Sequence, residues 1–364
     1  MSRKPPSKYI LILDTKRAQQ NLPACFPILK VSSALSTLFA TGLTAIAVGF
    51  GLLVLALKTN EVEIDYTKCD RLSSPDLQSS FTPPNVISWG FDFPLKTCKV
   101  KFTVQEDIPG PVYVMYGLTN FYQNHRKYVN SISHAQLEGK PLTYDQLGSC
   151  KPLDRDPETG KIYFPCGLRA DSFFSDNFLK LQREDGTPLH ISESGIAWEA
   201  DKEAFINTNY SAEHIVPPPM FQKRGFTEYT EENKNNIVTS ERFMVWMKTS
   251  PFSSFRKLYG KTSTMKKGTY LIDIESTYDV SSFSGTKTLI LSGSSIIGTR
   301  NFPIAVLWIS FGALILIVSI ATLIRHSLKS KAKREAQDAD LATELEAEII
   351  CSSETLNEIG KILE

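Results

Sequence analysis

The stretch "VSSALSTLFATGLTAIAVGFGLLVLAL" (residues 31–57) contains no charged side chain. A second uncharged stretch, "FPIAVLWISFGALILIVSIATLI", covers residues 302–324. A helix of about 20 apolar residues crosses the hydrocarbon core of a bilayer, so both stretches are long enough to span one. A buried core helix is the alternative, but uncharged runs of this length are rarely found in soluble cores. We therefore predict an integral membrane protein with two transmembrane helices.

The basic residues that flank the two spans predict the orientation of the chain. Between the spans only Lys58 and Arg300 lie close to the membrane. Outside them lie two basic clusters, which are Lys4, Lys8, Lys16, Arg17 and Lys30, and Arg325, Lys329, Lys331, Lys333 and Arg334. Because cytosolic flanks carry the excess of Lys and Arg, residues 1–30 and 325–364 are predicted to be cytosolic, and 58–301 lumenal or extracellular. The first span is too long and too late for a cleaved signal peptide, so we expect it to remain as an anchor.

The cysteines are placed as this orientation requires. Cys69, Cys98, Cys150 and Cys166 fall in residues 58–301, on the oxidising side where disulfides form. Four cysteines permit three pairings; we favour sequence neighbours, although spacing alone does not choose among the three. The same segment contains the sequon Asn209-Tyr210-Ser211, which predicts N-glycosylation of Asn209.

Alternating apolar residues indicate strands between the spans. Residues 99–105 ("KVKFTVQ"), 110–117 ("GPVYVMYG"), 269–275 ("TYLIDIE") and 286–292 ("TKTLILS") have this pattern and are bounded by turn residues. Helices are expected at residues 119–131 and at 241–257, where Pro251 interrupts, and an extended segment is expected at 214–225 because of its three prolines. We predict a mainly-β antiparallel sandwich with long loops and short helices.

The sequence offers no catalytic, metal or cofactor motif. The five histidines are scattered, and there is no Cys-x-x-Cys pair, nucleophile elbow or phosphate-binding loop. A formal charge of +1 gives no general attraction to nucleic acid, and the lumenal position excludes that partner. Acidic clusters at residues 154–158 and 171–176 lack the spacing of a calcium loop, so solvated surface is the favoured interpretation. We expect no enzyme, no cofactor and no small-molecule substrate.

Two features of the chain favour a protein partner. The first span carries small residues at four-residue spacing, which lets helix backbones approach closely; the pairs are Ser36/Ala40, Ala45/Gly49 and Ala47/Gly51. Residues 116–131, "YGLTNFYQNHRKYVNS", combine aromatic, basic and asparagine side chains. That mixture suits a helix packing its aromatics onto the sheet, and it also suits a surface that faces a partner. The residues alone leave both interpretations open.

The same residues resemble the hallmark segment of the cell division control protein 50 (Cdc50/Lem3) family. Further blocks resemble that family in the same order, at residues 19–29 ("QQNLPACFPIL"), 164–176, 194–205, 243–261 and 266–292. These proteins are accessory β subunits of type IV P-type ATPases, the phospholipid flippases. The resemblance covers residues 19 to 324 and leaves out the extreme N-terminus and the acidic tail.

The resemblance implies a lumenal β-sandwich on two spans with disulfides Cys69–Cys98 and Cys150–Cys166. It implies a 1:1 complex with a flippase α subunit in the lipid bilayer, acting in the endoplasmic reticulum, the Golgi and endosomal system or the plasma membrane. The subunit would help its partner leave the endoplasmic reticulum and become active, while ATP hydrolysis and lipid transport belong to the partner. The candidate interface residues are Gln19, Gln20, Leu22, Pro23, Asn120, Phe121, Tyr122, His125, Arg126, Tyr128 and Trp246.

Two alternatives share parts of this pattern. A two-span ion-channel subunit has the same topology, but the spans here offer no polar line for a pore. An ectodomain hydrolase would need a nucleophile beside a base, and none is apparent.

The tail, residues 335–364, has nine acidic residues and one lysine, with apolar positions at alternating spacings of four and three. It predicts an amphipathic acidic helix that docks on protein, or else a solvated tail.

Overall fold

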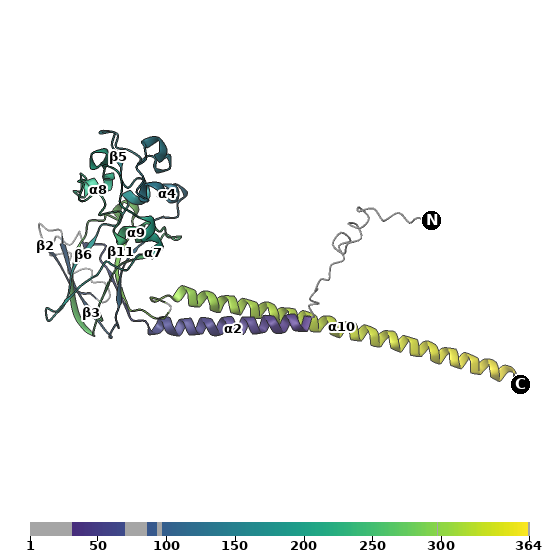
Figure 1. Ribbon diagram of the computed structural model, residues 1–364. Helices are drawn as coiled ribbons and strands as arrows, with labels where there is room; N and C mark the ends of the chain where they lie inside the picture. Colours follow the sequence, from purple (N-terminus) through teal and green to yellow (C-terminus); the bar gives the residue numbers. More distant parts are fainter. Residues whose placement is uncertain (1–30, 70–85, 93–96, 297, 363–364) are drawn as a thin grey trace, which may run out of the picture. The chain divides into compact units, whose positions relative to one another are not determined.

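The computed structural model describes residues 31–69, 86–92, 97–296 and 298–362 (Figure 1). The chain forms two compact units, of which one is Leu53–Phe302 and the other joins the residues that precede and follow it. The first of these is a β-sandwich and the second is a pair of long helices. Each unit has its own packing and is described separately.

The helical unit contains α2 (Val31–Lys58) and α10 (Phe302–Ile362), which run along each other (Figure 1). Val31–Lys58 and the segment Phe302–Thr343 of α10 are long and apolar enough to cross a membrane. The prediction of two spans is confirmed. The helix α10 continues without a break beyond residue 324, so the predicted helix in the acidic tail is present as far as Ile362.

Glycines bring the two long helices close together. A Cβ atom at Gly312 would lie 2.7 Å from the carbonyl oxygen of Gly42, and one at Gly49 would lie 2.9 Å from the backbone nitrogen of Ile309. Backbone atoms cannot move aside as a side chain can, so a larger residue would force the helices apart. The predicted pair Ala45/Gly49 therefore faces the second span of the same chain. Ser36, Ala40, Ala47 and Gly51 are exposed.

The sandwich has a four-stranded and a five-stranded antiparallel sheet, as predicted. The first has the order β1 (Glu61–Asp65), β11 (Lys287–Ser292), β4 (Val112–Leu118) and β9 (Phe255–Thr262). The second has the order β2 (Val86–Asp92), β3 (Thr97–Val104), β10 (Gly268–Glu275), β6 (Asn177–Arg183) and β7 (Pro188–Leu189). A parallel pair, β5 (Ile162–Tyr163) and β8 (Ile215–Val216), lies apart from both.

The alternation seen in the sequence places one face of each strand in the core. Val100 and Phe102 of β3 are fully buried, and Phe102 stacks on Tyr270 of β10 with ring centroids 5.9 Å apart. Burying such side chains contributes roughly 1.5–3 kcal/mol each, which makes this two-sided core the main source of stability.

Short helices fill the connections. They are α4 (Arg126–Asn130), α5 (His134–Leu137), α6 (Leu168–Asp171), α7 (Glu199–Ala204), α8 (Pro219–Lys223) and α9 (Glu241–Met247), with 3-10 turns η2 (Tyr144–Cys150), η3 (Ala212–His214) and η4 (Ser281–Phe283).

Three helix and loop boundaries differ from the predictions. The helix expected from residue 119 begins only at Arg126, because Asn120 adopts a left-handed conformation (φ 58°). The helix expected over residues 241–257 ends at Met247, and residues 255–262 form β9 instead. The expected extended segment contains α8, which starts at Pro219, where the fixed φ of proline suits a first helical residue.

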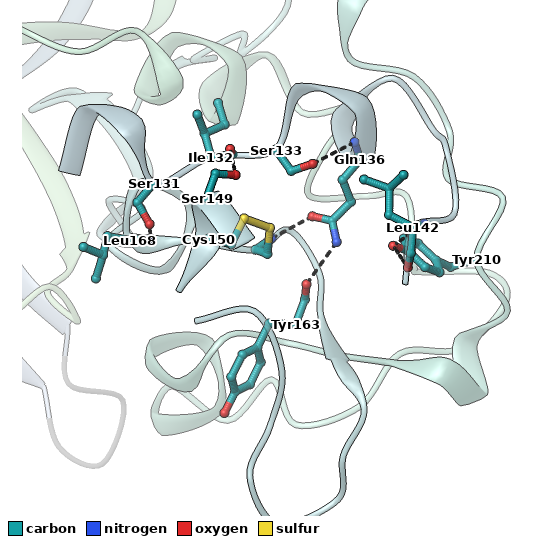
Figure 2. Close-up of a disulfide and its surroundings, with 11 residues drawn as sticks. Ser131, Ile132, Ser133, Gln136, Leu142, Ser149, Cys150, Tyr163, Leu168 and Tyr210 are labelled. Atoms are coloured by element: carbon teal, nitrogen blue, oxygen red, sulfur yellow. Dashed lines mark hydrogen bonds between the residues drawn. A yellow bond between two sulfur atoms is a disulfide. The ribbon is translucent and has the colours of Figure 1, made fainter. Parts of the chain in front are cut away.

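The disulfides are Cys69–Cys98 and Cys150–Cys166, the pairing that the family resemblance implies. Around the second lies a small separate core of Leu147, Tyr163 and the two cysteines. The buried amide of Gln136 supports it, donating to the Tyr163 carbonyl (3.2 Å) and accepting from the Cys166 N–H (2.8 Å), as Figure 2 shows.

Two acidic residues assigned to the solvated surface, Asp154 and Asp176, are buried instead. Asp176 is fully buried and pairs with Lys287 at 2.9 Å. The Tyr66 hydroxyl donates to the same carboxylate, which also accepts the N–H groups of Thr277 and Tyr278. Lys287 begins β11 and Tyr66 follows β1, both strands of the four-stranded sheet, whereas Asp176 directly precedes β6 of the five-stranded sheet. The pair therefore links the two sheets. The surface interpretation of Asp176 was wrong because its partners are remote in sequence.

Candidate functional site

Most of the predicted interface residues that the structure describes gather at one end of the first sheet. The loop of residues 119–125 leaves β4, and the loop of residues 248–254 enters β9, which pairs with β4 from Leu118 and Phe255 onward. The buried Gln123 accepts a hydrogen bond from the Ser250 N–H (2.9 Å), and Asn124 donates to the Pro251 carbonyl (2.8 Å). The two loops therefore form one structural unit.

The aromatic side chains under these loops belong to the core. Trp246 is 1% exposed and donates to the Arg169 carbonyl, and the buried Tyr128 bonds to Ser172. Phe121 packs against both rings, with centroids 5.8 Å away in each case. Burial raises the pKa of Tyr128 to about 12. Tyr128 and Trp246 thus support the loops from inside instead of facing a partner.

Other aromatic side chains on the same loops point outward. Tyr122 is 59% exposed and Phe252 is 72% exposed. Trp198, in the loop before α7, is 73% exposed, with the Lys248 ammonium 4.4 Å from its ring. We call Tyr122, Trp198 and Phe252, together with the exposed His125, Arg126 and Lys248, the aromatic loop surface. Trp198 and Phe252 are not among the interface residues predicted from the sequence, although both lie in segments that resemble the family, residues 194–205 and 243–261.

Glu241 fixes the loop that carries Trp198. Its carboxylate accepts the N–H groups of Gly195 (3.0 Å), Ile196 (2.6 Å) and Ala197 (2.8 Å), and Lys202 lies 3.3 Å away. Partial burial opposes ionisation, but these hydrogen bonds outweigh it and lower the pKa of Glu241 to about 2. The loop is thus held by a charge at the start of α9.

We expect this carboxylate to make stability depend on pH. A group with an unfolded pKa near 4.5 and a folded pKa of about 2 stabilises the native state above the unfolded value, and that contribution disappears as the pH falls through about 2. Glu241→Gln should therefore lower the melting temperature at pH 7, and the difference from the native chain should shrink between pH 4.5 and 2. Thermal unfolding of the detergent-solubilised chain measures this. The exposed Glu228→Gln is the control, and a difference independent of pH would contradict the assignment.

The outer side of α2 offers a second candidate surface. Exposed small residues follow it at spacings of three and four, and these are Ser33, Thr37, Ala40, Thr44, Ala47 and Gly51. A Cβ atom at Gly51 would meet nothing within 4 Å. This side is open to a helix from another chain.

Gln19, Gln20, Leu22 and Pro23 lie outside the described residues. Within the described ranges no three His, Cys, Asp or Glu side chains form a group that could hold a metal ion.

Comparisons with known proteins bear directly on this arrangement. The sequence model of the LEM3 (ligand-effect modulator 3) family/CDC50 family matches residues 52–332. The chain is 34% identical over 351 residues to the phospholipid-transporting ATPase accessory subunit CRF1 of Saccharomyces cerevisiae, covering 91% of this chain and 87% of that protein. It is 32% identical to cell cycle control protein 50A of Mus musculus (90% and 92% covered) and 32% identical to ALA-interacting subunit 3 of Arabidopsis thaliana (87% and 86% covered).

Proposed function

Because the chain belongs to the LEM3/CDC50 family, we propose that it is the accessory (β) subunit of a phospholipid-translocating P-type ATPase, a flippase. Relatives from Saccharomyces cerevisiae and Chaetomium thermophilum are named phospholipid-transporting ATPase accessory subunits, and this is the observation that carries the proposal. The chain contributes no catalysis, and the partner subunit hydrolyses ATP and moves the lipid from the exoplasmic to the cytosolic leaflet. Nothing in the comparisons supports a two-span ion channel.

The proposed mechanism is thermodynamic. A bound subunit shifts a transport cycle only through unequal affinity for the states of its partner. The aromatic loop surface and the outer side of α2 are the two places where such contacts would form, one in the ectodomain and one in the membrane. Residues 19–29 would add a cytosolic contact.

The proposed topology places both termini in the cytosol and residues 58–301 in the lumen or outside the cell. The excess of basic residues outside the two spans supports it, and so do the two disulfides of the ectodomain. The subunit would accompany its partner from the endoplasmic reticulum to the Golgi, the endosomes or the plasma membrane.

Co-purification tests the proposal. The full chain, solubilised in mild detergent from eukaryotic cells, should retain one large P-type ATPase in a 1:1 ratio, identified by mass spectrometry. Reconstituted with that ATPase, it should support ATP-driven movement of labelled phospholipid across vesicles. ATP hydrolysis by the purified chain alone, or ionic current through it, would refute the proposal.

A single substitution tests the aromatic loop surface. Trp198→Ala should reduce the co-purified ATPase about tenfold, because an exposed tryptophan that becomes buried in an interface typically contributes 1–2 kcal/mol or more. The melting temperature of the isolated chain should change little, since Trp198 is largely exposed. Leu179→Ala, at an exposed apolar position on β6, is the matched control and should leave assembly intact. Equal yields from both variants would place the contact elsewhere.

A further inference from the structure

A broad hollow of about 700 Å³ lies beside the small core around Cys150 and Cys166. Three segments line it, residues 141–145, 159–162 and 209–211, together with Glu213 and His214. None of these residues takes part in the aromatic loop surface. The proposed function leaves the hollow unexplained.

The hollow is lined by both apolar and polar side chains. Leu142 and Ile162 line it and also pack against the small core, which has only four buried residues in the described chain. Tyr144 is 48% exposed, with the Arg155 guanidinium over its ring at 4.8 Å from the centroid, and hydroxyl and carboxylate groups border the hollow at Thr143 and Asp145. An aromatic ring beside hydrogen-bonding groups suits a ligand with one apolar face and many hydroxyls, as a sugar has.

Asn209, the acceptor residue of the sequon, is itself part of this lining. Its side chain is exposed, and its backbone N–H is fixed by a 3.0 Å hydrogen bond to the Gly139 carbonyl. The next residue, Tyr210, is buried, and its hydroxyl both donates to the Leu142 carbonyl and accepts from the Leu142 N–H, each at 2.7 Å (Figure 2). The sequon is therefore tied to the wall of the hollow.

We infer that this hollow is an intramolecular carbohydrate site, which holds the first N-acetylglucosamine residues of a glycan on Asn209 against Tyr144, Leu142 and Ile162. The inference rests on the lumenal placement proposed above. Attachment joins Asn209 Nδ2 to the anomeric carbon of the sugar; the nitrogen loses a proton, and the lipid diphosphate of a lipid-linked oligosaccharide donor leaves. The seated sugars cover apolar surface that the small core leaves exposed, and so they stabilise this part of the ectodomain.

The test separates occupancy of the sequon from seating of the glycan. The full chain is expressed in eukaryotic cells with and without its ATPase partner, and intact mass compares it with Asn209→Gln, which should lack one glycan. Native and denatured chains are then treated with peptide-N-glycosidase. Tyr144→Ala should release the Asn209 glycan about tenfold faster than the native chain, since loss of one ring contact changes an opening equilibrium by about a decade. Tyr144→Phe keeps the ring, and Leu179→Ala removes an exposed apolar side chain on β6, so both should behave as the native chain.

Each contrary result is distinct. An Asn209 without glycan overturns the inference and also counts against the lumenal placement, while co-purification of the ATPase still decides the function. If the glycan is released at the same rate from every natively folded variant, the hollow does not hold it. Resistance that appears only in the complex would mean that the partner shields the glycan, and this too overturns the inference.

Discussion

Lys287→Met is expected to lower the free energy of unfolding of the ectodomain by about 3–5 kcal/mol, because it leaves the Asp176 carboxylate buried without its counter-charge. The two atoms of the pair are 2.9 Å apart and neither side chain reaches solvent. For a membrane-anchored chain this loss should appear as a large drop in melting temperature and as poor recovery of folded protein. Thermal unfolding followed by tryptophan fluorescence measures the first, and size-exclusion chromatography the second.

A double variant distinguishes the charge from the packing. Asp176→Asn removes the negative charge but keeps an oxygen that can accept the N–H groups of Thr277 and Tyr278. Lys287→Met combined with Asp176→Asn should therefore be more stable than Lys287→Met alone. Lys266→Met breaks the exposed pair between Lys266 and Asp107 and should have little effect. If the double variant were the least stable of the set, the cost would come from shape and not from an unpaired charge.

Gly49→Leu and Gly51→Leu are expected to fail in different ways, although they lie two residues apart on α2. A side chain at Gly49 meets the backbone of Ile309, so leucine should force the span pair apart and destabilise the chain by about 1–3 kcal/mol or more. The loss should be visible in the isolated chain as reduced recovery of monodisperse protein in detergent.

A side chain at Gly51 meets nothing in this chain. Gly51→Leu should therefore leave the isolated chain intact and yet reduce the co-purified ATPase about tenfold, if a partner helix packs on the outer side of α2. Phe50→Trp adds bulk at an exposed position about 100° around the same helix from Gly51 and should have no effect on assembly. Normal assembly of Gly51→Leu would exclude this side of α2 as a contact.

The residue types predicted which segment forms much of the candidate site, but they could not predict which of its side chains are buried and which are exposed. In the sequence, residues 116–131 admit two interpretations, a helix that packs its aromatics onto the sheet and a surface that faces a partner. Tyr128 is buried, as packing onto the sheet requires, whereas Tyr122, His125 and Arg126 are exposed, which is compatible with a surface that faces a partner. Sequence pattern could not make this division, because Asn120 interrupts the expected helix and changes which residues share a face. The place of Trp198 could not be predicted because Lys248, which lies against its ring, is fifty residues away in the chain.

The sequence by itself determined the features that depend on composition and short-range period. Two uncharged runs can satisfy their backbone groups in a membrane only as helices, and alternating apolar residues can bury one side only as strands. Only the tertiary structure decided which distant residues come into contact. Asp176 and Lys287 form a buried pair, the Asn209 sequon borders a hollow, and Gly49 faces a helix of its own chain while Gly51 faces outward. These contacts join residues that are far apart in the chain, and their energies depend on distance and burial, which a local pattern does not contain.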